Sequence, residues 1–137
     1  MATETWAELA GYPIFPMGGA PGVYVIYDHR GNPKYVGSSD RVWGRLGDKH
    51  VSGDNSHAIQ RAYLLAIPDK EKRVSFIQKH IKVHIVETSS LAEAVDLENR
   101  LIAKYRPSWN IKGIAGKRKT DAGVSEPFDP EFMQPYI

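Results

Sequence analysis

The fold is decided by two short apolar runs, which read GVYVIY at residues 22–27 and KYVG at residues 34–37, with RGNP at residues 30–33 between them. Both runs are rich in β-branched and aromatic residues, which favour extended strands. The glycine, asparagine and proline between them are residues of tight turns. This stretch therefore predicts a β-hairpin.

Helical patterns follow the hairpin. Residues 38–40 offer serine and aspartate oxygens that can cap a first short helix, which ends before Gly47. A second helix is predicted over residues 58–67, where apolar side chains recur on one side. Pro68 ends it and stands at the first position of a third helix, over residues 69–80.

A third strand and a long helix complete the pattern. Residues 82–87 alternate polar and apolar side chains, which predicts a strand. Ser90 and Glu93 have the spacing of a capping box, and apolar residues continue from there at helical period. The helix is predicted over residues 91–105, because the residue before Pro107 is pushed out of the helical region.

These elements predict one domain of the α/β (α+β) class, with a small, three-stranded, mainly antiparallel sheet flanked by helices. We place the domain at residues 22–112. Residues 1–21 are expected to be a lead-in, with a helical turn or two between Thr5 and Ala10. Residues 113–137 show no periodicity, which predicts an irregular tail that is either loose or wrapped over the domain.

The composition excludes several classes of protein. With 137 residues, 42% hydrophobic and 25% charged, the chain has the balance of one globular domain. Its apolar stretches are far shorter than the roughly 20 residues of a membrane-spanning helix, and its first residues do not resemble a signal peptide. It contains no cysteine, which excludes disulfide scaffolds, thiolate metal sites and cysteine nucleophiles. We expect a cytoplasmic protein with no membrane partner.

Positive charge is concentrated in the middle of the chain. The formal net charge is only +2, but residues 41–82 contain nine basic and four acidic side chains. Such a run is most often a solvated face, and it can also contact nucleic-acid phosphates.

The candidates for the hydrolysis of a phosphodiester, which needs positive charge at the phosphate, a deprotonated nucleophile and help for the leaving oxygen, cluster in two places. Tyr24 and Tyr35 lie on the two hairpin strands, with Gly37 at the start of the next helix and Arg45 one to two turns down it. Glu98 lies on the long helix, and Asn110 follows that helix. Each has an ordinary interpretation when taken alone. Hairpin tyrosines usually pack in a core, and helix glutamates usually form surface ion pairs.

Taken together, these residues resemble the GIY-YIG nuclease family. Gly22-Val23-Tyr24 corresponds to the first triplet and Tyr35-Val36-Gly37 to the second, with ten residues between the two tyrosines. Arg45 follows Gly37 by eight residues, at the position of the family arginine, and Asn110 follows Glu98 by twelve. The stretch from Gly22 to Asn110 is especially similar to the N-terminal incision domain of bacterial nucleotide-excision repair.

The resemblance implies a role for each residue. Glu98 is expected to be the single protein ligand of a divalent cation, Mg²⁺ or alternatively Mn²⁺, because a hard oxygen donor suits an otherwise water-ligated ion. Arg45 is expected to hold a phosphate oxygen. Tyr24 is expected to position or deprotonate the attacking water, with support from Tyr35. Asn110 is expected to fix the edge of the site and to orient Glu98 or the helix end.

One position departs from the family pattern. Many members carry a histidine or tyrosine four residues after the arginine, where this chain has Lys49, followed by His50. Lys49 lies on the same helix face as Arg45 if the helix continues, whereas His50 is turned by about 100°. Either is a candidate to activate Tyr24, and Lys49 could instead contact a phosphate. The candidate nucleic-acid contacts are Gly37, Ser38, Arg41, Arg45, Lys49 and Arg61.

The leading hypothesis is a metal-dependent endonuclease that cuts DNA with weak intrinsic sequence specificity. Residues 1–21 and 113–137 show no further DNA-binding module, so targeting is expected to need a partner or a homodimer. One alternative is a catalytically weak or inactive nucleic-acid-binding module of the same fold, which the departure at Lys49 favours. Another is a scaffold that binds other proteins through residues 113–137.

Overall fold

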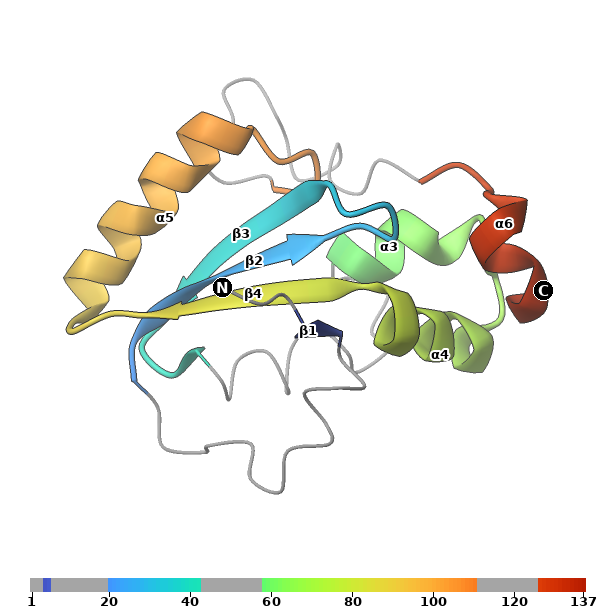
Figure 1. The fold of residues 1–137 in the computed structure, drawn as a ribbon, viewed down its shortest axis with the longest axis horizontal. Coiled ribbons are helices and arrows are strands. Elements are labelled where there is room, and N and C mark those ends of the chain that lie inside the picture. Colours follow the sequence, from blue (N-terminus) through green and yellow to red (C-terminus); the bar gives the residue numbers. More distant parts are fainter. Residues whose placement is uncertain (1–3, 6–19, 43–57, 111–125) are drawn as a thin grey trace.

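The computed structural model describes residues 4–5, 20–42, 58–110 and 126–137, which build one antiparallel sheet (Figure 1). The strand order is β1-β4-β2-β3. The three long strands are β2 (Gly22–Tyr27), β3 (Pro33–Ser39) and β4 (Lys82–Glu87), and they confirm the predicted three-stranded antiparallel sheet. A two-residue strand, β1 (Glu4–Thr5), extends the sheet beyond β4. The expectation of a helical turn from Thr5 is therefore wrong at that residue, whose backbone pairs with Lys82.

The turn of the hairpin is stabilised by one carboxylate. Asp28 Oδ1 accepts hydrogen bonds from the backbone N–H groups of Arg30 and Asn32, both at 2.9 Å. Gly31 has φ of 87°, a left-handed conformation that glycine adopts without steric cost. These local contacts explain why the polar residues between the strands form a tight turn.

Four helices and a short 3-10 turn are described: α3 (Ala58–Leu64), α4 (Lys70–His80), α5 (Leu91–Tyr105), α6 (Pro130–Met133) and η2 (Gln134–Tyr136). Asp69 caps α4 by accepting a hydrogen bond from the Lys72 N–H at 3.0 Å. Pro68 therefore precedes the cap, and the prediction that it occupies the first helical position is wrong.

The predicted cap of α5 is confirmed, because the Ser90 hydroxyl accepts a hydrogen bond from the Glu93 N–H at 3.1 Å. In a complete capping box the Glu93 carboxylate would accept a hydrogen bond from the backbone N–H of Ser90. Here it accepts one from the Ser89 hydroxyl instead. α5 ends at Tyr105, and the next residue, Arg106, has φ of 46° and ψ of 57°, outside the right-handed helical region.

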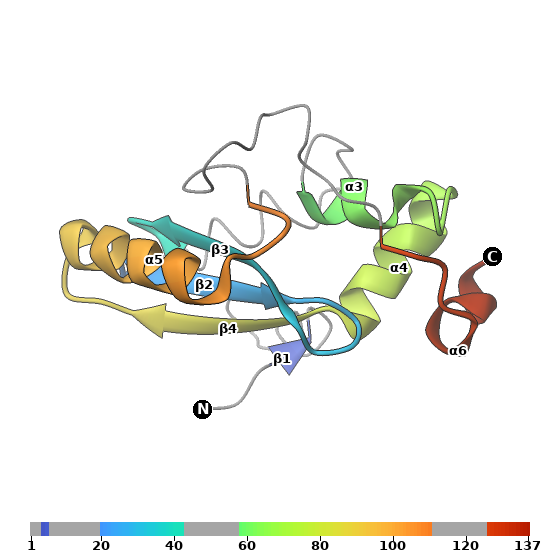
Figure 2. The same ribbon diagram turned by 90° about the horizontal axis from the view of Figure 1, so that it is seen from above.

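The two faces of the sheet pack against different helices, because side chains alternate along each strand. Val23, Val25 and Val36 face α5, where they meet Ala94 and Ile102. The opposite face carries Tyr24 and Ile26 and packs against α3, α4 and the C-terminal residues. Figures 1 and 2 show α5 along one end of the molecule, with α3, α4 and α6 gathered at the other.

Several sequence predictions lie outside the described residues. They include most of the N-terminal lead-in and the short helix before Gly47, of which only Val42 is described. Of the tail, residues 126–137 pack onto the domain, and Met133 is fully buried there. Within the described parts of the chain, no helix is both long and apolar enough to cross a membrane.

Candidate active site

The two motif tyrosines lie together on one face of the sheet. Tyr24 is paired with Gly37 and Tyr35 with Ile26 across the β2–β3 ladder, so the two tyrosines are diagonal neighbours. Their ring centroids are 6.1 Å apart and their planes differ by 22°, which is a stacked arrangement. Tyr24 is only 1% exposed, whereas Tyr35 is partly buried at the margin of the core. The structure thus brings together the two tyrosines that the sequence singled out.

The motif glycines make room for close packing around this pair. A Cβ atom at Gly37 would lie 2.4 Å from Cζ and Oη of Tyr24, closer than any real Cβ contact. A Cβ atom at Gly22 would lie 2.5 Å from the carbonyl oxygen of Val86 on β4. Gly37 therefore lets the end of the Tyr24 ring approach β3 closely, and Gly22 lets β4 approach β2.

Asn110 ties the chain after α5 to the open edge of the sheet. Its Oδ1 accepts a hydrogen bond from the Val36 N–H at 2.8 Å, and its Nδ2 donates to the Val36 carbonyl at 2.9 Å. Beside it, the Trp109 N–H donates to the Lys34 carbonyl at 2.9 Å. Since β3 is an edge strand, these bonds satisfy backbone groups that would otherwise have no partner strand. Both side-chain bonds of Asn110 run to β3, and neither runs to Glu98 or the helix end.

Glu98 is a buried carboxylate on the inner stripe of α5. It is 7% exposed and lies one turn from Ala94 and from Ile102, which pack on the sheet. Its Oε1 is buried without a hydrogen-bond partner among the described residues. The ion pair on this helix joins two other residues, Arg100 and Asp96, at 2.7 Å on the surface. Glu98 is therefore not the surface ion-pair residue that its sequence neighbours would indicate.

A divalent cation fits this carboxylate. A buried carboxylate without a partner is costly, and a bound cation removes that cost. Within the described ranges, no three acidic, histidine or cysteine side chains are close enough to form a metal cluster. Mg²⁺ usually keeps several waters and binds one or two carboxylates, so a site with Glu98 as a protein ligand is compatible with this ion.

The carboxylate and the tyrosines approach β3 from opposite faces. Tyr35 points to the face that carries α3 and α4, and Val36 points to the face that carries α5 and Glu98. β3 and its outer edge, where Asn110 is bound, are the elements common to both halves of the candidate site.

Comparison with known proteins decides the family. A family model described as the GIY-YIG catalytic domain matches residues 20–112. The chain belongs to the GIY-YIG family.

Two curated proteins with the same name are similar to this GIY-YIG chain. It is 31% identical over 105 residues to the UvrABC system protein C of Chlamydia trachomatis serovar D, covering 76% of this chain and 15% of that protein. It is 33% identical over 91 residues to the same protein from Zymomonas mobilis, covering 66% and 12%. The chain thus spans no more than 15% of the length of these two curated relatives.

A solved structure is also similar. The GIY-YIG N-terminal endonuclease domain of UvrC from Thermotoga maritima, bound to magnesium as its catalytic divalent cation, is 31% identical. The match covers 71% of this chain and 90% of that one, with a TM-score of 0.44.

The remaining GIY-YIG candidates are only partly described. Arg45, Lys49 and His50 lie outside the described residues. Ser38 is half-buried at the end of β3 and Arg41 is exposed beyond it. Arg61 lies on α3, half-buried, with its Nε buried and without a hydrogen-bond partner in the described part of the chain.

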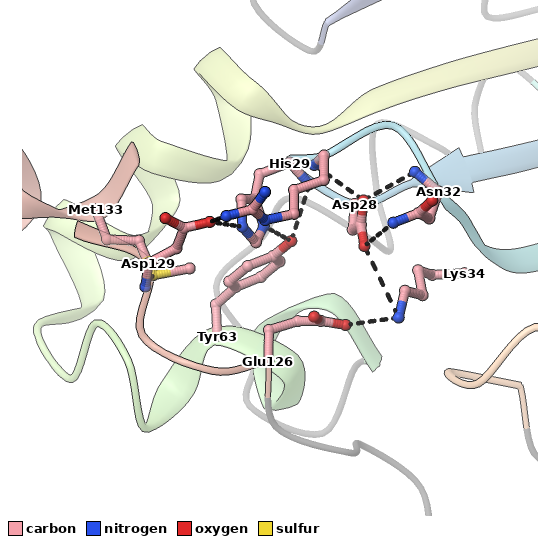
Figure 3. Close-up of polar contacts among 9 residues, drawn as sticks. Asp28, His29, Asn32, Lys34, Tyr63, Glu126, Asp129 and Met133 are labelled. Atoms are coloured by element: carbon pink, nitrogen blue, oxygen red, sulfur yellow. Dashed lines mark hydrogen bonds and ion pairs between the residues drawn. The ribbon is translucent and has the colours of Figure 1, made fainter. Parts of the chain in front are cut away.

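Sequence reasoning missed a buried polar network at the other end of the hairpin (Figure 3). The Tyr63 hydroxyl lies 2.9 Å from Nδ1 of His29, and Nε2 of His29 lies 3.3 Å from Oδ2 of Asp129. Arg30 donates to the same carboxylate oxygen. The partners are 34 and 100 residues apart, so no local pattern reveals them.

Burial and charge set the ionisation of this network. Burial raises the pKa of the Tyr63 hydroxyl well above its ordinary value of 10.0, and nearby Glu126 and Asp28 add to that effect against a lowering hydrogen bond from the His29 backbone. Burial also acts to raise the pKa of Asp129, but hydrogen bonds and positive charge from Arg30 and His29 outweigh it and lower that pKa below 3.8. Tyr63 therefore stays neutral and Asp129 stays ionised at neutral pH.

Proposed function

We propose that the chain is a divalent-metal-dependent endonuclease that hydrolyses phosphodiester bonds in DNA. The observation that carries the proposal is the buried Glu98 carboxylate, whose Oε1 has no hydrogen-bond partner among the described residues of a GIY-YIG domain. A structural glutamate would be expected to have a donor for each buried oxygen. A glutamate that binds a cation needs one oxygen free.

Glu98 would hold the ion. Mg²⁺ is the proposed ion, because the similar domain of Thermotoga maritima UvrC binds magnesium as its catalytic cation, and Mn²⁺ is the alternative. When bound, the ion supplies Lewis-acid polarisation of the phosphate and stabilisation of the leaving oxygen.

The tyrosine pair is proposed to handle the attacking water. The Tyr24 hydroxyl orients the water or, once it has lost its own proton to a neighbouring base, accepts the proton of the water as the phenolate, and Tyr35, stacked beside it, restricts the Tyr24 ring. A phenol with an ordinary pKa near 10 is a weak base at neutral pH, so Tyr24 needs a nearby positive charge. Lys49 and His50 are the proposed sources of that help, and Arg45 is proposed to hold a non-bridging phosphate oxygen.

DNA is proposed to reach the site from the end of β3. Gly37, Ser38 and Arg41 belong to this end of the hairpin, and Arg61 on α3 and the positions of Arg45 and Lys49 add positive charge to the same basic run. Contacts of this kind bind phosphates and carry little sequence information, so weak sequence preference is expected.

Targeting is proposed to come from a second component. The matched region is a small part of the curated relatives, which are named as one protein of the UvrABC system. We propose that a targeting partner or a second copy of the chain supplies the targeting here. The absence of cysteine accords with a cytoplasmic location.

Relaxation of supercoiled plasmid by the purified chain tests the proposal. We expect nicked circles with Mg²⁺ or Mn²⁺ and none with a chelator, and cleavage sites scattered over the plasmid. Plasmid binding without nicking in any divalent metal would assign the chain to the binding-module alternative instead. A single sharp cleavage site would contradict the weak specificity.

A further inference from the structure

The C-terminal strap, residues 126–137, lies beyond the family-matched range of 20–112 and is anchored to the domain at both of its ends. At one end, Asp129 receives hydrogen bonds from His29 and Arg30 of the hairpin turn. At the other end, Tyr136 lies 3.3 Å from the His80 ring of α4. The strap therefore lies outside the part of the chain that the family model matches.

Glu126, the first residue of the strap, joins three separate elements. Its Oε1 accepts a hydrogen bond from Nε1 of the Trp109 indole at 3.2 Å. The same oxygen lies 3.2 Å from Nζ of Lys34 on β3 (Figure 3). Its backbone N–H donates to the Ala62 carbonyl of α3 at 2.7 Å. With only 10% of its side chain exposed, Glu126 is a fixed junction instead of a mobile surface acid.

The Trp109 side chain that Glu126 holds is adjacent to the edge of the candidate active site. Trp109 is fully buried and packs edge-on against Tyr63, with ring centroids 5.8 Å apart. Its backbone N–H is bonded to Lys34, and the next residue, Asn110, makes both side-chain bonds to Val36.

Val36, to which the Asn110 side chain is hydrogen-bonded, belongs to the second family triplet, Tyr35-Val36-Gly37. Val36 stands between Tyr35, which stacks on Tyr24, and Gly37, which the Tyr24 ring covers. A displacement of Trp109 would therefore move Asn110 along β3 and change the positions of the Tyr24 and Tyr35 side chains.

We propose that Glu126 is a positioning residue of the nuclease site. By accepting a hydrogen bond from Trp109, it holds the adjacent Asn110 in place on the edge of β3. Its effect on cleavage rests on the proposed function, whereas its effect on β3 does not. Burying the indole N–H of Trp109 without an acceptor would cost free energy, so the position of the Trp109 side chain depends on that of Glu126.

Two variants of nearly equal shape isolate that hydrogen bond. Glu126→Gln keeps a carbonyl oxygen that can accept from the Trp109 indole, whereas Glu126→Met keeps the length and removes the acceptor. Both lose the negative charge that faces Lys34, and the comparison is made in a Lys34→Met background, because the oxygen retained in Glu126→Gln would otherwise still accept a hydrogen bond from Nζ of Lys34. Ile77→Val, in the core on α4 and not one of the three bonding partners of Glu126, serves as a control for general loss of stability.

The direct measurement is amide hydrogen exchange at Val36 in the full chain, because that N–H is bonded to Asn110 Oδ1. We expect Glu126→Met to speed exchange at Val36 roughly fivefold to tenfold, which is the loss of about one hydrogen bond, while Glu126→Gln stays within about twofold. The indole Nε1–H signal of Trp109 should shift in the Met variant alone. Val36 exchange that is equal in the two variants, or that changes only as much as in Ile77→Val, would overturn the proposal.

Cleavage provides the second measurement. Plasmid nicking by Glu126→Met is expected to show a kcat reduced roughly tenfold with KM nearly unchanged, because a small misplacement of reacting groups affects the chemical step. Glu126→Gln should restore most of it. If the wild-type chain does not nick DNA, the proposed function fails, and Val36 exchange still decides the positioning role. Faster exchange at Val36 with wild-type kcat would overturn the link to the active site.

Discussion

Replacing Gly37 by alanine should damage the site more than it damages the fold. The added Cβ would lie 2.4 Å from Cζ and Oη of Tyr24, and ordinary contacts begin at about 3.5 Å, so the ring or β3 must move by about 1 Å. Tyr24 is 1% exposed and stacked on Tyr35, which leaves little room for that movement. Overpacking of this kind costs roughly 1–3 kcal/mol of unfolding free energy. A displacement of about 1 Å in the reacting groups can cost about 100-fold in rate.

Gly31→Ala is the matched control. Gly31 has φ of 87°, and a Cβ atom added there would have nothing within 4 Å, so alanine introduces backbone strain without a clash. That strain costs roughly 1–2 kcal/mol, close to the cost at Gly37. Urea unfolding should therefore show similar losses, while metal-dependent plasmid nicking should fall only in Gly37→Ala. Equal nicking rates in the two variants, with both folded, would refute the role of Gly37 in positioning Tyr24.

Two further predictions concern the edge and the hairpin turn. Asn110→Ala removes both bonds to Val36 and should lower the free energy of unfolding by roughly 1–3 kcal/mol, measured in urea; a loss below about 0.5 kcal/mol would contradict that. Arg30 and His29 lower the pKa of Asp129. Ionised Asp129 therefore stabilises the folded state fully above the ordinary carboxyl pKa, and this stabilisation is lost as the pH falls through the lowered pKa of Asp129. Unfolding free energy should therefore decrease more between pH 6 and pH 3 in the wild type than in Asp129→Asn, and equal decreases would contradict the prediction.

The hairpin, β4 and α5 could be predicted because their signals are local. Alternation defines the strands, and Ser90 and Glu93 define the start of α5 within one turn. The motif spacing likewise identified Tyr24 and Tyr35 as a pair, which the stacked rings bear out as neighbours.

The missed features depend on contacts between distant parts of the chain. β1 is two residues long and forms only because β4 offers an open edge. The His29–Asp129 contact joins residues 100 apart, and Glu126, the partner of Trp109, lies in a stretch without periodicity. Burial of Glu98 was missed because the basic residues Arg100 and Lys104 indicated a surface ion pair, although Ala94 and Ile102, one turn away on either side, are apolar and buried.

Plasmid nicking and urea unfolding of Glu98→Ala test the central claim most directly, with Asp96→Ala as the control. Both residues are carboxylates on α5, but Asp96 is 67% exposed and paired with Arg100, whereas Glu98 is buried with Oε1 unpartnered among the described residues. We expect Glu98→Ala to abolish metal-dependent nicking while its unfolding free energy is unchanged or higher, because a buried carboxylate without a partner is removed. Asp96→Ala should nick like the wild type. Wild-type nicking by Glu98→Ala would contradict the account.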